Sequence, residues 1–228
     1  MYPPDRFCPV DGRDPFQFRA AADGFRAMRG FDVYLGHYGH DLYRAVDTGH
    51  AQITNFRHPA ARLASLYNYF RFTVRATPED LESRDYTAVR LAKSASFEDF
   101  VLCDDPMVAM YTCDHHFRQL ANTPWSLTST RSEHAVVDMV MAMPWFYVCE
   151  FPEASYLWAR RTLGWALDRV KRENVTEEGE AAASILAMSD RLYDKVMARN
   201  VRDLALHRMA VDRLIGATAF SLQAVAAE

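Results

Sequence analysis

The hydrophobic period of the chain changes abruptly at Arg57–Pro59, and this change constrains the fold more than any other feature. The preceding segment, Ala51–Phe56, has a strand-like pattern that runs straight into these three residues. Beyond them, apolar residues recur at the spacing of one helix face: Leu63, Leu66, Tyr67 and Phe70. Proline is tolerated at the first helical position because no backbone N–H is needed there. The pattern therefore predicts a strand, a tight turn and a helix over Pro59–Phe72.

Two further segments, Phe31–Leu35 and Phe146–Cys149, are predicted strands. Helical patterns separate and follow them: most of 78–143, a helix from Pro152 to a C-cap at Gly164, and two long helices over Glu177–Arg199 and Asp203–Ala226. Strands alternating with helices are typical of a parallel sheet with helices on its faces. We therefore expect an α/β fold with a helix-rich C-terminal half and a sheet that lacks at least one strand.

Composition narrows the possible function classes. The 228 residues are 50% hydrophobic and 25% charged, with no linker or repeat, which predicts one domain over 1–228. A net charge of −4 disfavours nucleic-acid binding. The four cysteines include no C-x-x-C pair, so free thiols in a reducing, cytoplasmic setting are expected. No signal peptide or membrane-spanning segment is predicted.

The predicted turn is also the best candidate site. A guanidinium at the carboxyl end of a parallel strand, beside a helix N-terminus, lies where α/β folds bind anions. Arg57 could hold a phosphate with its two-pronged side chain, and Ser65 lies off the apolar stripe of the helix. From the pattern alone, a surface arginine and a solvated serine are the simpler explanation.

The segment Arg57–Tyr69 resembles the R-D-P-x-x-R-x-x-S-x-Y-x-Y signature of sulfotransferases, and the chain is most similar to the carbohydrate type, which includes heparan sulfate 2-O-sulfotransferase. The resemblance implies a P-loop-like sheet and the donor 3′-phosphoadenosine 5′-phosphosulfate (PAPS), with its 3′-phosphate on Arg57 and Ser65. His58 replaces the usual aspartate. The Gly-His at Gly36–His37 resembles the pair that supplies the catalytic base, which would be His37, with His40 as the alternative.

Later segments follow the family's order as well. Phe146–Ser155 is similar to V-G-L-T-E-R-F-D-E-S and keeps Glu150 and Ser155; the remaining similar segments, typical of bacterial members, are Leu163–Trp165, Asn174–Thr176 and Asp190–Tyr193. By the same resemblance Arg118 is a weaker candidate for donor binding. Arg172, in the pair Lys171-Arg172, is another, although a solvated helix arginine and a solvated charge pair explain these positions as well.

The chain departs from the family pattern in the part that would bind the 5′-phosphosulfate of PAPS. The family's first strand carries a phosphate-binding loop of the P-K-T-G-G-T-S kind, and this chain, opening on Met1–Pro4, shows no such loop. We therefore expect the first strand and the loop to lie upstream or to have been lost, and this chain to transfer sulfate weakly or not at all.

Metal binding is not expected. Adjacent residues point apart, which weakens Cys113–His116 as a cluster, and His37 and His40 have no third ligand near them in the sequence. Two functions remain: a metal-free enzyme that transfers a sulfuryl group to a hydroxyl, such as that of a carbohydrate, and a non-catalytic relative that binds a nucleotide or a partner.

Overall fold

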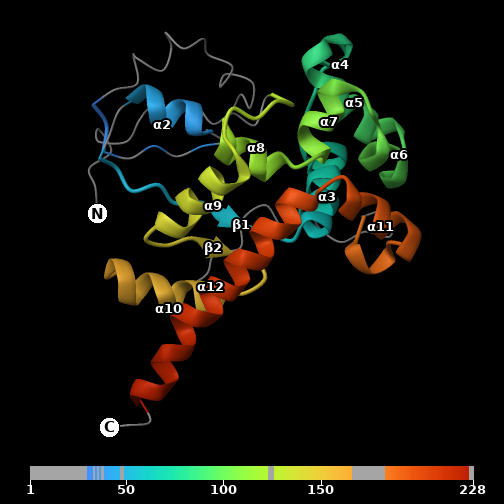
Figure 1. Cartoon of the computed structure of the whole chain (residues 1–228). Coiled ribbons are helices and arrows are strands. Elements are labelled where there is room, and N and C mark those ends of the chain that lie inside the picture. Colours follow the sequence, from blue (N-terminus) through green and yellow to red (C-terminus); the bar gives the residue numbers. More distant parts are fainter. Residues whose placement is uncertain are drawn as a thin grey trace. The chain divides into compact units, whose positions relative to one another are not determined.

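The computed structural model describes residues 30–32, 34, 36, 39–46, 49–122, 126–165 and 183–225. These residues form a mostly helical α/β structure with one small parallel sheet (Figure 1). The elements in chain order are α2 (His40–Val46), β1 (Asn55–Phe56), α3 (Pro59–Asn68), the π-helical turn η3 (Tyr69–Thr73), α4 (Pro78–Glu82), the 3₁₀ turn η4 (Arg84–Tyr86), α5 (Thr87–Ser94), α6 (Phe97–Leu102), α7 (Pro106–Thr112), α8 (His115–Ala121), α9 (Glu133–Ala142), β2 (Tyr147–Val148), α10 (Pro152–Leu163), the 3₁₀ turn η5 (Ile185–Ala187), α11 (Asp190–Ala198) and α12 (Val201–Val225).

The chain divides into two compact units. One comprises 1–51 and 115–141, and the other comprises 52–114 and 142–228. In the first unit, α2 packs against α8. All but the last residue of α9 belong to the first unit as well, and the second unit holds the sheet and the other helices. The sequence predicts a single domain over 1–228, that is, one unit that folds on its own. The division into compact units does not test that prediction.

The sheet of the second unit consists of β1 and β2 alone among the described residues, paired in parallel. Asn55 pairs with Tyr147 and Phe56 with Val148. Helix α12 runs along both strands and continues past α10, and α10 packs against β2 and α12 (Figure 1). The parallel arrangement of these two predicted strands is confirmed.

Aromatic side chains fill the space between the sheet and its helices. Phe56 and Phe146 are fully buried and meet edge to face, with ring centroids 5.0 Å apart. Phe146 also meets the Trp158 ring edge to face at 4.9 Å. Edge-to-face pairs at this distance add stability beyond the area they bury. These three side chains join β1, β2 and α10 into one core.

The predicted strands are longer than the observed ones. Of Ala51–Phe56 only two residues form a strand, and Ile53 is 42% exposed. Among the described residues β1 has only β2 beside it, and their pairing ends near Thr54, whose carbonyl accepts from the amide of Tyr147 at 3.0 Å. The strand predicted over Phe146–Cys149 is also shorter in the structure, where it covers only Tyr147–Val148.

The strand predicted over Phe31–Leu35 is wrong for the residues of that segment that the structure describes. The amide of Phe31 donates to the hydroxyl of Tyr34 at 3.3 Å, and the two rings meet edge to face. The carbonyl of Phe31 is 3.0 Å from His50 Nε2. These local contacts satisfy groups that a strand would have used in a ladder.

The helix from Pro152 to Gly164 is confirmed. Gly164 has a φ of 67°, the left-handed conformation that favours glycine at a helix end. The helix predicted over Glu177–Arg199 is confirmed over Asp190–Ala198, which is α11, and is wrong over the described residues before it, where only the 3₁₀ turn η5 forms. The Ser189 hydroxyl accepts from the amide of Leu192 and so caps the helix at that point. Helix α12 confirms the last predicted helix with a start two residues earlier.

Candidate functional site

The turn between β1 and α3 has the form predicted from the sequence. Arg57 follows β1 directly and is exposed, His58 is the N-cap residue of α3, and Pro59 is the first residue of that helix. The N-terminus of a helix such as α3 carries partial positive charge. Arg57 therefore adds a full positive charge beside a helix end that already favours anions.

One face of α3 leads away from Arg57. Ala61, Ser65 and Tyr69 follow at four-residue intervals, so they lie on the same side of the helix. None of the three is buried, and Tyr69 is 40% exposed. Ser65, the second predicted phosphate ligand, thus lies on a partly accessible face of α3, one turn beyond Ala61.

Other residues of the same segment bind main chain instead. Arg62 Nη2 donates to the carbonyl oxygen of Tyr111 in α7 at 2.9 Å. The buried Asn68 amide donates to the carbonyl of Ala183 at 2.9 Å and accepts from its amide at 2.8 Å. These contacts hold α3 in the fold and leave Arg57 and Ser65 as the ligand candidates.

A cluster of titratable side chains lies at the carboxyl ends of both strands. Glu150, just after β2, accepts from the backbone N–H of His58 through Oε1 at 2.8 Å. Its Oε2 is 3.1 Å from His207 Nε2 on α12. The hydroxyl of Tyr193 on α11 is 3.3 Å from His58 Nε2. Residues of α11 and α12, together with Glu150 after β2, therefore meet at the turn that carries Arg57.

Burial and hydrogen bonding set the charges in this cluster. Burial, and next the proximity of His207, lower the pKa of His58 below its ordinary value, against the opposing effect of Glu150. Burial opposes ionisation of Glu150, but hydrogen bonds from His207 and from the His58 N–H outweigh it and lower the pKa of the carboxyl. At neutral pH the cluster therefore contains a neutral His58 beside an ionised Glu150.

The remaining predicted ligands are not brought to this turn by any described contact. His37 and Arg172 lie outside the described residues. Arg118 belongs to the first unit, where it is 3% exposed and its Nη1 donates to the carbonyl oxygen of Ser126. The guanidinium of Arg118 is thus engaged with main chain in its own unit.

His40, the alternative base, lies in the first unit with Arg131. The Arg131 Nη1 atom is 2.8 Å from His40 Nε2. Burial, and then the charges of Arg131 and Arg44, lower the pKa of His40 to about 4. The imidazole is therefore neutral at pH 7 and accepts the hydrogen bond of a guanidinium.

We expect acid to weaken the first unit through His40. Between pH 6.5 and about 4 the unfolded chain binds a proton at His40 that the folded chain excludes, so the free energy of unfolding falls as pH falls through this range. Because one proton is involved, the slope cannot exceed about 1.4 kcal/mol per pH unit, and the partial exposure of the imidazole reduces it further. Urea unfolding at pH 5 and pH 7 should show a smaller difference in His40→Gln than in the wild type. His134→Gln, at an exposed histidine of the same unit, is the control, and equal pH dependence in wild type and His40→Gln would contradict the assignment.

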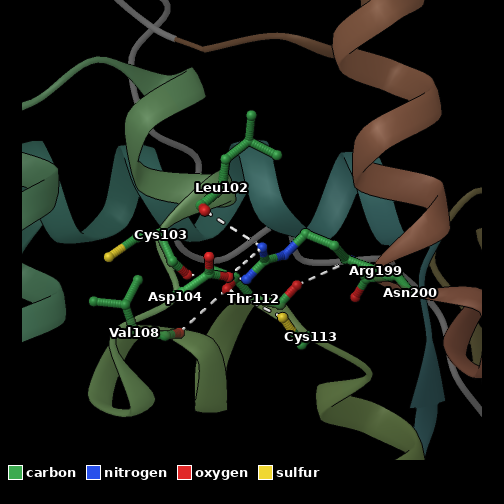
Figure 2. A network of polar contacts seen from close by, with 8 residues as sticks. All are labelled: Leu102, Cys103, Asp104, Val108, Thr112, Cys113, Arg199 and Asn200. Carbon is green, nitrogen blue, oxygen red and sulfur yellow. Dashed lines mark hydrogen bonds and ion pairs between the residues drawn. The ribbon is translucent and has the colours of Figure 1, made fainter.

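A second polar network joins α11 and α12 to the segments around α7 (Figure 2). Arg199 donates through Nη1 to Asp104 Oδ1 at 2.7 Å and through Nη2 to the carbonyl of Cys103 at 2.9 Å. The fully buried Asn200 donates through Nδ2 to the carbonyl of Thr112 at 2.9 Å. Its Oδ1 accepts from the amide of Asp114 at 3.0 Å. These contacts are with main chain and one exposed carboxylate, which indicates a structural role.

One residue of the cluster at the strand ends, His207, could have been singled out from the sequence pattern of its helix. His207 lies on the buried stripe of α12, between the buried residues Asp203 and Ala210. A polar side chain on a buried helix face needs a partner, so the pattern indicated a contact without identifying Glu150. His58 was expected only as a replacement for aspartate, with no role of its own.

Comparisons with protein-family models, with curated proteins and with solved structures found no match to this chain. Within the described ranges, no group of three or more His, Cys, Asp or Glu residues is placed to hold a metal ion. In the same part of the chain, no helix has both the length and the apolar character needed to cross a membrane. Cys103, Cys113 and Cys149 are free thiols.

Proposed function

We propose that the turn between β1 and α3 binds the 3′-phosphate of a phosphoadenosine nucleotide, and that the protein is related to enzymes that transfer a sulfuryl group from PAPS to a hydroxyl. The observation that carries the proposal is the exposed Arg57 at the carboxyl end of a parallel strand, directly before the N-terminus of α3. The accessible face with Ser65 supports it. The proposal includes a P-loop-like sheet, with β1 and β2 as two of its strands.

The chemistry of sulfuryl transfer defines the roles. The acceptor oxygen displaces the nucleotide's phosphate in line, which requires a base for the hydroxyl proton and positive charge for the leaving phosphate. In this proposal His37 is the base, since an imidazole accepts a proton near neutral pH. Arg57 and Ser65 hold the nucleotide, and Arg172 is a further candidate for donor binding. No metal takes part, and the free thiols favour a cytoplasmic setting.

Calorimetry with 3′-phosphoadenosine 5′-phosphate tests the binding step. A charge-assisted contact to a phosphate contributes about 1.5–3 kcal/mol, so Arg57→Ala should weaken binding roughly ten- to hundredfold. The affinity of Arg57→Lys should lie between those of the wild type and Arg57→Ala, because lysine keeps the charge and loses the bidentate contact. Arg161→Ala, at an exposed arginine of α10, is the matched control.

Equal affinity of wild type and Arg57→Ala would refute the assignment of the phosphate to this turn. A transfer assay with radiolabelled sulfate then separates the two classes of function. Nucleotide binding with transfer indicates the enzyme, whereas binding without transfer indicates the non-catalytic relative.

A further inference from the structure

The carboxylate of Glu150 contacts two parts of the chain that are far apart in sequence. Oε1 accepts the backbone N–H of His58 at 2.8 Å, and Oε2 accepts from His207 Nε2 at 3.1 Å. The two hydrogen bonds outweigh burial and lower the pKa of the carboxyl, so it is ionised at neutral pH. Each oxygen of Glu150 thus already has an N–H donor from the protein.

The N–H that Glu150 accepts belongs to the peptide group between Arg57 and His58. His58 has φ −53° and ψ 129°, outside the helix, and its own side chain makes no capping bond. The next residue, Pro59, has no N–H. Rotation of the peptide between Arg57 and His58 would move the Arg57 main chain relative to the end of α3. Glu150 holds that peptide from the turn that follows β2.

The ring of His58 is held as well. It stacks on Tyr193 with an interplanar angle of 14° and ring centroids 6.1 Å apart, and the Tyr193 hydroxyl is 3.3 Å from Nε2. The His207 ring meets it edge to face at 5.4 Å. The residue after Arg57 is therefore fixed through its main chain by Glu150 and through its side chain by α11 and α12.

We propose that Glu150 is a positioning residue of the anion site: it holds the Arg57–His58 peptide so that the guanidinium stays beside the N-terminus of α3, without contacting the ligand itself. This proposal rests on the proposed function. Its test combines a ligand measurement with one that needs no ligand.

The test variant is Glu150→Gln, which keeps the shape but replaces one acceptor oxygen with an N–H₂ donor. We expect the amide proton of His58 to shift upfield in ¹H–¹⁵N NMR spectra and its exchange with solvent to accelerate. Affinity for 3′-phosphoadenosine 5′-phosphate should fall roughly three- to tenfold, less than in Arg57→Ala. Glu153→Gln, at an exposed carboxylate in the first turn of α10, should change neither measurement.

A double variant separates positioning from general damage. If Glu150 acts through Arg57, then Arg57→Ala with Glu150→Gln should bind the nucleotide as Arg57→Ala alone does. A further tenfold loss in the double variant, or an unchanged His58 resonance in Glu150→Gln, would overturn the proposal. Absence of binding by the wild type would overturn the proposed function and the ligand role of Glu150 together. The NMR measurement would still show whether Glu150 holds the turn.

Discussion

Replacing Phe146 by alanine should lower the free energy of unfolding by about 3–5 kcal/mol. The side chain is fully buried next to β2, and its ring meets those of Phe56 and Trp158 at 5.0 and 4.9 Å. The guanidinium of Arg213 lies 5.3 Å from the centroid of the same ring. The substitution therefore removes apolar burial, two edge-to-face contacts and a cation–π contact at one position.

Urea unfolding followed by tryptophan fluorescence measures this loss, since Trp158 lies against the deleted ring. Phe146→Leu should retain most of the stability because it leaves a smaller cavity. Phe151→Ala, at a phenylalanine that is 46% exposed, is the control and should cost far less. A loss below 1 kcal/mol in Phe146→Ala would contradict the core described for the second unit.

Replacing Asn200 by alanine should cost about 2–4 kcal/mol, because it leaves buried backbone groups without partners. The Asn200 side chain bonds the carbonyls of Thr112 and Val196 and the amide of Asp114; Figure 2 shows Asn200 with Thr112. Asp114 has a φ of 42°, a strained conformation for a residue other than glycine. Its carboxylate accepts from the amides of Arg202 and Asp203 in the first turn of α12.

A second substitution at the same position tests whether the lost hydrogen bonds explain the destabilisation. Asn200→Asp keeps the acceptor for Asp114 but loses both donated hydrogen bonds and adds a buried negative charge near another carboxylate, so it should cost at least as much as alanine. Asn55→Ala, at an exposed asparagine of β1, provides the baseline in the same urea experiment. Near wild-type stability of Asn200→Asp would show that the donated bonds contribute little.

The sequence was most informative where a local rule and the tertiary structure agree. At Arg57–Pro59 the hydrophobic period, the proline and the start of α3 coincide, so the turn could be predicted. Strand length could not, because alternation reports which residues are half-buried and not how many neighbouring strands offer hydrogen bonds. The segment around Ile53 has the alternating pattern, but no strand among the described residues pairs with it.

The hydrogen bonds around Glu150 could not be predicted from local sequence patterns, for a different reason. Its hydrogen bonds span 92 residues to His58 and 57 residues to His207. Nothing in the spacing of a single sequence identifies such pairs. The burial of His207 indicates a partner, but only the packing of α12 along both strands identifies Glu150 as that partner.

The parallel pairing of β1 with β2 affects the order in which the protein can form during its synthesis. Phe56 leaves the ribosome 92 residues before its partner Val148, with the segment 115–141 of the other unit in between. At typical translation speeds, roughly 5–18 s pass between the two strands. Throughout that interval the apolar side chain of Phe56 has neither its strand partner nor Phe146, so a nascent chain halted before residue 148 should bind chaperones that recognise exposed apolar segments.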